Sequence, residues 1–406
     1  MLRNIGEVAG LADEWKELLG RTATQEIFRS WPWISSWWEV FGREDGREPF
    51  VIGVRQGRQL VGLAPLLMRP GRGVGRARLR HLEFMGTGEA EPDEVCSDFQ
   101  DVYSAQGFED QVATAVWRRL RDERPHWDVA VFRNILDGSV LSRFVGPMAR
   151  DAGCAVFRRS SGERFWVDLK ARDFNAYTDT LSKKKKKRIF YYRRRLEKEG
   201  GFVERRIEDR AEIPFFLAEI ARLSRLRLGQ KGMESAWQSR KFRRFHAVVA
   251  PRLFDQGWLD MRLWTKDGRT VAALYNFLYE GSIHYYQSGF DTAAFGNVSP
   301  GLVTISHVIE WGFTHQLKRY DFLIGAEGSY KEDYGCETEV SSDITFYNTT
   351  LRGQLGSAAH AVRQTLSDYK ARARAEARAA AAAAAGGANG PSVVGERDDD
   401  DEQRSG

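Results

Sequence analysis

The chain has 406 residues, of which 42% are hydrophobic, enough for two ordinary domains, and its 12% aromatic content is typical of folded protein. It has no run of about 18 apolar residues, which excludes a membrane-spanning helix, and its acidic N-terminus predicts no signal peptide. The three cysteines lie far apart, which excludes a disulfide framework and predicts a cytoplasmic protein. The seven histidines form no i, i+4 pair and no Cys/His cluster, so no metal site is expected.

The net charge of +5 is distributed unevenly along the chain. Residues 386–406 contain six acidic and two basic side chains, a net of −4, so the remainder of the chain carries +9. This excess of positive charge favours an anionic ligand or an anionic surface as a partner.

The first half of the sequence predicts an α+β unit. Residues 49–55 and 58–68 alternate apolar and polar side chains around Gln56-Gly57, a pattern typical of a β-hairpin. A third strand is expected over 78–85, and an acidic loop is expected between this strand and residue 108. The remaining pattern then predicts, in order, a helix over 108–122, a strand over 127–133, a helix over 139–152 and a strand over 155–159.

The second half repeats this order with stronger signals. Glu280-Gly281 and Asp267-Gly268 separate three β-rich segments, which predicts a three-stranded meander. The expected elements are strands over 259–266, 270–279 and 283–290, a helix over 302–316, a strand over 319–324, a short helix over 330–334 and a strand over 343–347.

Helical segments connect these units and follow them. We expect a strongly basic helix over 182–199 and a helical hairpin over 211–228 and 239–255. The Ala/Arg-rich segment 351–385 predicts an exposed helix, and the acidic segment 386–406 predicts a disordered tail. The expected domains are one unit over 1–165, one over 166–350 that includes the basic helix, then this helix and this tail.

The start of the helix after the meander is a candidate anion site. Free N–H groups and the helix dipole face the preceding loop, here Asn297-Val298-Ser299-Pro300-Gly301. Pro300 suits a first helical turn, and Gly301 allows close approach of a ligand to the backbone. The same residues also suit a helix start with no ligand, and both interpretations are open at this point.

Residues 301–335 carry a more specific motif. Glu310-Trp311-Gly312 ends the helix, and Tyr320-Asp321-Phe322-Leu323-Ile324-Gly325 and Tyr330-Lys331 follow. With the Trp-rich run 28–38 and with Leu181-Ser182 before the Lys/Arg run, this motif resembles the CelD-like (cellulose biosynthesis) or BioF2-like branch of the GNAT acetyltransferases, over about residues 20–350. That branch is related to the FemABX peptidyltransferases, which contain two tandem GNAT-like units.

The resemblance implies an α+β fold of two tandem GNAT-like units, each a mixed twisted sheet flanked by helices, with an inserted basic helical hairpin. It implies an acyl-CoA donor bound through Asn297, Ser299 and Gly301, with its acyl group between the strands over 283–290 and 319–324. The superfamily's pyrophosphate loop, (Q/R)xxGx(G/A), is reduced here to NVSPG. Acetyl-CoA, a longer acyl-CoA and an aminoacyl-tRNA are therefore alternative donors.

Four residues of the motif are candidates for the chemistry. Acyl transfer to an amine needs a base, an oxyanion donor and a group that protonates the leaving thiolate. Asp321 and Glu327 are candidate bases, Tyr330 a candidate donor to the leaving sulfur, and Lys331 a candidate phosphate ligand of the cofactor. Each also has a structural alternative, which for Asp321 is a buried, hydrogen-bonded anchor.

The basic helix over 182–199 contains ten Lys and Arg residues against two Glu. Lys184 and Arg188 are spaced to share a helical face and are candidate phosphate-binding residues, although a solvated face needs no partner. The helix also suggests weak contact with tRNA or with the inner face of an anionic membrane. No specific DNA binding is expected.

The Trp cluster over 31–38 has the spacing of an amphipathic helix packed on a core. The alternative is a platform for an acceptor, for which Trp33 and Trp37 are the candidates.

These observations favour an N-acyltransferase that acts on an amine, less readily a hydroxyl, of a sugar, nucleotide-sugar or cell-envelope (exopolysaccharide) precursor. One alternative is a tRNA-dependent aminoacyl transferase of FemABX type. The other is a non-catalytic GNAT-fold scaffold that binds anions in polysaccharide synthesis. The reduced pyrophosphate loop over 297–301, called the donor loop below, favours the alternatives. The motif over 321–331 favours the enzyme.

Overall fold

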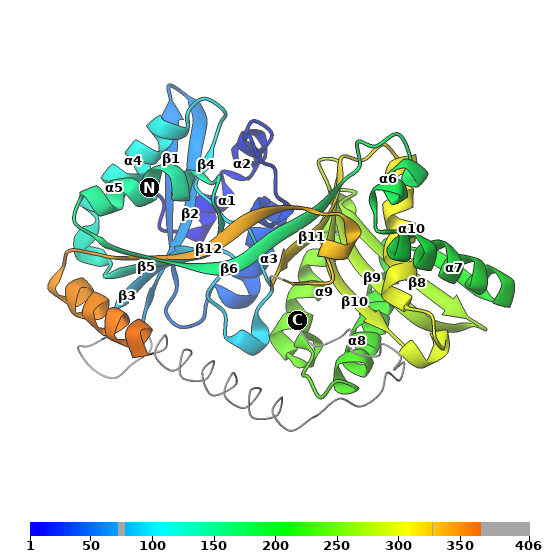
Figure 1. Cartoon of the computed structure of the whole chain (residues 1–406). Coiled ribbons are helices and arrows are strands. Elements are labelled where there is room, and N and C mark those ends of the chain that lie inside the picture. Colours follow the sequence, from blue (N-terminus) through cyan, green and yellow to red (C-terminus); the bar gives the residue numbers. More distant parts are fainter. Residues whose placement is uncertain (72–77, 327, 367–406) are drawn as a thin grey trace, which may run out of the picture.

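The computed structural model describes residues 1–71, 78–326 and 328–366. Its described strands form one 12-stranded mixed sheet in the order β1-β2-β3-β5-β12-β6-β11-β10-β9-β8-β7, with β4 paired to β2. Figure 1 shows two halves side by side, joined by the long strands β6 (Ala155–Asp168) and β12 (Glu337–Tyr347). β12 pairs with β5 and β6, and β6 pairs with β11. The boundary expected after residue 165 thus falls inside β6, and the two units share one sheet.

The N-terminal half confirms the predicted hairpin and the helix that follows the acidic loop. The segment expected as a helix over 139–152 begins instead as a π-helical turn, Leu141–Val145. The elements of this half are α1 (Ile5–Ala9), α2 (Ala12–Leu19), α3 (Trp31–Phe41), β1 (Glu48–Gln56), β2 (Gln59–Pro70), β3 (Arg80–Phe84), β4 (Tyr103–Ser104), α4 (Glu109–Asp122), β5 (Val129–Leu136) and α5 (Gly146–Asp151).

The C-terminal half confirms the predicted meander. Asp267 and Glu280 have φ of 51° and 49°, and each is followed by a glycine with positive φ, as tight hairpin turns require. The elements of this half are α6 (Phe174–Thr180), α7 (Lys183–Glu199), β7 (Phe202–Arg206), α8 (Ile213–Gly229), α9 (Arg240–Asp255), β8 (Leu259–Lys266), β9 (Arg269–Tyr279), β10 (Ser282–Phe290), α10 (Pro300–Thr314) and β11 (Arg319–Gly325).

Two strands are longer than their sequences indicate. The strand expected over 155–159 continues to Asp168, and the strand expected over 343–347 begins at Glu337. The added segments pair with each other, and that of β6 also pairs with β11, which lies far away in the sequence. Pairing with these distant strands, which local alternation does not reveal, extends both elements.

The Trp-rich helix α3 belongs to the core between the halves. Trp33 and Trp37 are fully buried, and the Trp33 ring lies 4.9 Å from that of Phe245 in α9. Their indole N–H groups donate to the Oγ of Ser97 at 2.8 Å and to the Oε1 of Glu89 at 2.5 Å. The interpretation of this helix as one packed on a core is therefore confirmed, and the alternative that Trp33 and Trp37 contact an acceptor is wrong, because both rings are enclosed by protein.

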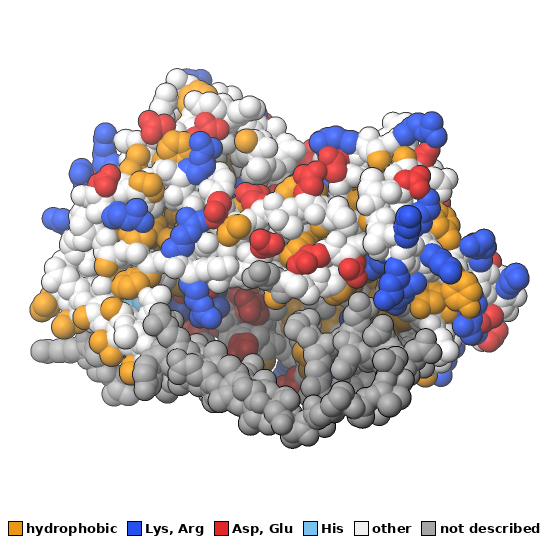
Figure 2. All heavy atoms as spheres, in the orientation of Figure 1, with side chains coloured by type: hydrophobic (Ala, Val, Ile, Leu, Met, Phe, Trp, Pro, Cys, Tyr) orange, Lys and Arg blue, Asp and Glu red, His pale blue; other side chains and the backbone are white. Residues whose placement is uncertain are grey.

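The outer end of the C-terminal half is basic. Figure 2 shows Lys and Arg side chains gathered there, over α7. In the part of the chain that the structure describes, no helix combines the length and apolarity that crossing a bilayer requires. Residues 351–366 are helical, whereas 367–385 and the predicted tail, 386–406, lie outside the described residues.

Candidate functional site

Strands β10 and β11 run parallel and separate after a short pairing. Their register covers only residues 282–284 with 319–321. Both strands have a β-bulge just beyond it, because the pairing of β10 with β9 skips Tyr286 and the pairing of β11 with β6 skips Phe322. A bulge bends its strand and leaves the extra residue outside the ladder. The sheet therefore opens between β10 and β11, where the acyl group was expected.

A cavity of about 280 Å³ lies at this opening. Its walls are residues 285–288 of β10, 322–324 of β11, Tyr330 and Lys331, the α8 residues Ser224, Arg227 and Leu228, and Cys96 and Asp98 from the acidic loop. The C-terminal half thus supplies the two separated strands, and the N-terminal half supplies a carboxylate, that of Asp98, to the same cavity.

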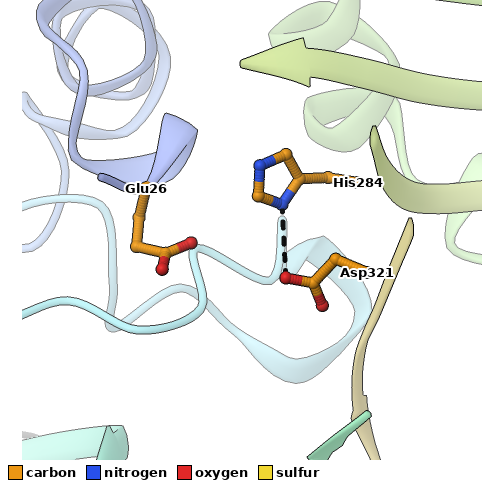
Figure 3. Close-up of side chains that lie close together, drawn as sticks. All are labelled: Glu26, His284 and Asp321. Atoms are coloured by element: carbon orange, nitrogen blue, oxygen red, sulfur yellow. Dashed lines mark ion pairs between the residues drawn. The ribbon is translucent and has the colours of Figure 1, made fainter. Parts of the chain in front are cut away.

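A buried network of charges lies beneath the opening. In Figure 3, Glu26, His284 and Asp321 point toward one another from the N-terminal half, β10 and β11. The guanidinium of Arg164, which comes from β6, donates to both oxygens of Glu26 at 2.8 and 3.0 Å and, through Nε, to the Oδ2 of Asp321 at 2.9 Å. Burial would raise the pKa of Asp321, but the charge of Arg164 outweighs it and lowers this pKa to about 2.

The same three residues place potential metal ligands within 4.8 Å of one another. Arg164, however, already donates hydrogen bonds to both carboxylates, so a metal ion would have to displace a guanidinium. Burial lowers the pKa of His284 to about 4, and this ring is therefore neutral at pH 7. We interpret the network as an ion-pair anchor between the two halves.

Asp321 supports the bulge of β11. Its Oδ1 accepts a hydrogen bond of 2.8 Å from the backbone N–H of Leu323, which has an unusual φ of 60°. The side chain is fully buried and is not among the residues that line the cavity. The alternative of a buried anchor therefore fits Asp321, and the role of base does not, because a carboxylate held by Arg164 takes up a proton only near pH 2.

Lys331 lines the cavity and is bound to β11. Its Nζ donates to the carbonyl oxygens of Phe322 at 2.9 Å and Ile324 at 2.6 Å, on either side of the bulge. A Cβ at Gly325 would lie 3.1 Å from the Cδ of Lys331, so the glycine leaves room for this side chain. Burial lowers the pKa of Lys331 to about 8. The ammonium is thus engaged by backbone, whereas the sequence predicted a phosphate.

Asp98 is a candidate base that the sequence did not reveal. It lines the cavity, is 6% exposed, and accepts a hydrogen bond of 2.8 Å from the Nδ2 of Asn134. Burial raises its pKa to about 7, and the nearby charge of Glu94 acts in the same direction. A base is most effective when its pKa lies near the working pH. The acidic loop was visible in the sequence, but nothing there distinguished Asp98 from its acidic neighbours.

Tyr286 attaches the acidic loop to β10. Its hydroxyl donates to the carbonyl oxygen of Val95 at 2.8 Å and lies 3.1 Å from the Nε2 of His246. The bulged residue of β10 therefore holds the loop that carries Asp98.

The predicted donor loop lies beside the opening. Ser299 caps α10 by accepting a hydrogen bond of 3.4 Å from Leu302 N–H, and Asn297 is exposed. A Cβ at Gly301 would meet Phe290 at 3.7 Å, an ordinary contact, so packing does not require glycine there. None of the three predicted donor-loop residues is among those that line the cavity.

The other predicted residues are distributed as follows. Tyr330 lines the cavity and is 47% exposed, whereas Glu327 lies outside the described residues. Lys184 and Arg188 lie on α7 and are not among the cavity residues.

The cavity also contains a cation that the sequence did not single out. Arg227, near the end of α8, lines the cavity and donates to the Oγ of Ser288 at 3.2 Å. Lys231 follows one turn later, and burial together with the charge of Arg227 lowers its pKa. These two cations lie near the end of β10, which leads into the donor loop.

Comparisons with known proteins address the fold and the class of domain. Residues 183–332 match the model of the acetyltransferase (GNAT) domain family. The chain matches no curated protein in sequence. Among solved structures, FemX is similar with a TM-score of 0.57 and 10% identity, over 85% of this chain and 97% of that chain. A conserved protein of unknown function from Bacteroides thetaiotaomicron VPI-5482 has a TM-score of 0.51 and 10% identity, over 83% and 97%.

A tandem GNAT protein from the clavulanic acid biosynthesis pathway has a TM-score of 0.47 and 12% identity, over 84% of this chain and 96% of that chain. At such identities, a structural likeness concerns the fold alone. The domain match and the observed α+β architecture confirm the predicted fold class and support an acyltransferase.

Proposed function

We propose that the chain is an N-acyltransferase that holds an acyl thioester between β10 and β11 and transfers the acyl group to an amine. The observation that carries this proposal is the cavity at the two bulges, which Asp98 also lines. An acyl group needs such a gap, because a fully paired sheet leaves no room between strands. Backbone N–H groups released by a bulge are the type of donor that stabilises an oxyanion.

In this mechanism, Asp98 accepts a proton from the acceptor amine. The nitrogen lone pair then forms the C–N bond, the C–S bond breaks, and the leaving thiolate takes a proton. Tyr330 is the candidate donor of that proton because its hydroxyl side chain lines the cavity. A carboxylate whose pKa is about 7 suits an amine better than a hydroxyl, which needs a stronger base.

The proposed donor is an acyl-CoA. Its phosphates would lie at the start of α10, at Asn297, Ser299 and Gly301, with Arg227 as a nearby cation. The positive end of a helix suits an anion. Lys331 contributes through the shape of β11, since its Nζ is occupied by two carbonyl groups.

The proposed acceptor follows from the CelD-like resemblance, which suggests an amine of a sugar, nucleotide-sugar or cell-envelope precursor. Transfer from an aminoacyl-tRNA is the second candidate. The fold shared with FemX over 85% of this chain supports keeping it, together with the reduced donor loop.

The test uses the purified full chain with acetyl-CoA, longer acyl-CoAs and aminoacyl-tRNA. We expect one acyl-CoA to raise the melting temperature, since a ligand at 100 times its Kd adds about 2.7 kcal/mol of stability. We also expect release of free thiol when an amine is added. The Asp98→Asn variant should bind the donor normally and release thiol far more slowly. A shift with aminoacyl-tRNA alone would favour the second candidate, and no shift with any donor would overturn the proposal in favour of a scaffold.

A further inference from the structure

Helix α7 is attached to the protein by one face only. Ile189 and Leu196 are buried on that face, and Arg193 is ion-paired with Glu310 of α10. Ser182 caps the helix by accepting from Lys185 N–H. Figure 1 shows α7 at the outer end of the C-terminal half, away from the junction of the two halves. The cavity takes no residue from α7.

The opposite face of α7 presents a continuous basic stripe. The basic stripe consists of Lys183, Lys187, Tyr191, Arg194 and Lys198. These residues follow one another at intervals of four, four, three and four, so at 3.6 residues per turn they lie within about 80° of one another and span about 22 Å. All five side chains are exposed, and that of Tyr191 is 53% exposed.

The cations of the basic stripe differ from those beside it. On the flanks, Lys186 is paired with Asp179 and Arg195 with Glu199. Within residues 1–71, 78–326 and 328–366, the four cations of the stripe form no ion pair with an acidic side chain. The two glutamates of α7 flank the stripe: at this spacing Glu197 lies about 40° beyond one edge and Glu199 about 80° beyond the other. The outward face of α7 is therefore a line of four cations that the described acidic side chains do not pair.

We propose that the basic stripe is a docking surface for an anionic membrane, whose lipid phosphates it contacts at headgroup level. Polybasic segments are attracted to anionic lipid surfaces, and a tyrosine suits the membrane interface. The apolar face of α7 is already buried against the protein, so the helix docks on the surface without inserting. This inference is independent of the proposed acyl transfer, since no residue of the stripe lines the cavity.

The single exposed ring of the stripe favours a membrane over a nucleic acid. Lys183, Lys187 and Arg194 border an open surface hollow together with Lys186 and Phe190, and Tyr191 is the one member of the stripe with an aromatic ring. A single-stranded nucleic acid is better served by a groove with several exposed rings on which successive bases stack.

The experiment is co-sedimentation of the full chain with vesicles of phosphatidylcholine, with and without phosphatidylglycerol. We expect binding only to the anionic vesicles, and weaker binding as salt rises. Replacing Lys183, Lys187, Arg194 and Lys198 by Gln should lower the partition coefficient of the protein onto anionic vesicles by more than about tenfold.

A matched control removes the same charge elsewhere. Lys16, Arg58, Arg118 and Arg121 are exposed cations of the N-terminal half, and their joint replacement by Gln should leave vesicle binding nearly unchanged. Thermal melting of both variants checks folding, and Tyr191→Ala, which keeps every charge, should weaken binding only slightly. Wild-type binding by the stripe variant, or no binding of the wild type to anionic vesicles, would overturn the proposal. Binding to bulk tRNA but not to vesicles would replace it with a nucleic-acid surface.

Discussion

The Nζ of Lys331 donates a hydrogen bond of 2.9 Å to the carbonyl oxygen of Phe322, the residue that the pairing of β11 with β6 skips. A second bond reaches the carbonyl oxygen of Ile324. A single ammonium thus donates to two carbonyl groups at the point where β11 is no longer paired with β10. We propose that Lys331 is a positioning residue, which stabilises this end of β11 without a partner strand and would act on the donor through the shape of the cavity.

Replacing Lys331 by Met should lower kcat/KM for acyl transfer by about tenfold or more. The variant keeps the length of the side chain but leaves two carbonyl groups without their donor, at a cost of about 1–3 kcal/mol. Steady-state kinetics and thermal melting are the measurements. Lys318→Met, at an exposed lysine next to β11, is the control and should retain wild-type activity. If both variants behave alike, the ammonium of Lys331 has no role in shaping the cavity.

Asp98→Asn should lower kcat by about 10²–10⁴-fold, the usual contribution of a general base. Because burial raises the pKa of Asp98 to about 7, the carboxylate is protonated below pH 7 and active above it. The wild-type kcat/KM should therefore rise with pH through about 7, and the variant should lose this rise. A pH profile that is the same in both proteins would rule out Asp98 as the base.

The same carboxyl group should also affect stability. Its pKa is raised on folding from an ordinary value of 3.8 to about 7, so the folded state binds more protons than the unfolded state between these pH values. The free energy of unfolding should then fall as pH rises through this window. Asp98→Asn keeps the partner Asn134 and should be more stable than the wild type at pH 8, with the difference disappearing near pH 4. Urea unfolding at the two pH values measures this.

Asp321→Asn should destabilise the protein by about 3–5 kcal/mol, because it leaves Arg164 buried with one carboxylate fewer. The pKa of Asp321 is depressed to about 2, so its contribution is fully present above pH 4 and is lost as pH falls toward 2. Urea unfolding at pH 7 is the measurement, with Asp168→Asn at the half-buried end of β6 as the control. An activity loss without a stability loss would instead support the role of a base.

Gly301→Ala should leave folding unchanged, because the added Cβ meets Phe290 at an ordinary 3.7 Å. Alanine is also well tolerated in a first helical turn. Any loss of acyl-CoA affinity in this variant therefore reports on the donor itself. We expect the Kd, measured by calorimetry, to rise severalfold with kcat preserved. An unchanged Kd would move the donor phosphates away from the start of α10.

The elements that the sequence predicted well are those with local signals. The turns at Asp267 and Glu280, the start of the basic helix near residue 182 and the Pro300 helix start are each encoded within a few residues. The motif at Tyr330-Lys331 was also placed beside the opening, where both side chains line the cavity.

The remaining features depend on contacts between distant segments. Arg164 forms a hydrogen bond with Asp321, 157 residues away in the sequence, and the charge of Asp98 acts on Lys331 only because the fold brings both to one cavity. Burial sets the pKa of Asp98, and one sequence does not show which acidic residue of a loop becomes buried. The helical spacing of the Trp residues in α3 predicted packing on a core, but it did not show that α9 is the partner that encloses Trp33.

Tyr286→Phe should raise KM for the acceptor amine, because it releases the acidic loop from β10. The hydroxyl donates to Val95 and lies next to His246, so its loss removes a link between the two halves and costs about 1 kcal/mol of stability. The loop that carries Asp98 then samples more positions, and the pH at which activity rises should shift. Steady-state kinetics across pH measure both effects.

Tyr275→Phe is the matched control for this variant. Its hydroxyl lies 3.3 Å from the other ring nitrogen of His246, and the side chain is also buried. Its loss is the same chemical change on the other side of the same histidine. We expect the two variants to lose similar stability, whereas only Tyr286→Phe changes KM and the pH profile. Equal kinetic effects would mean that His246, and not the bond to Val95, transmits the change, and the loop would then need another explanation for its position over the cavity.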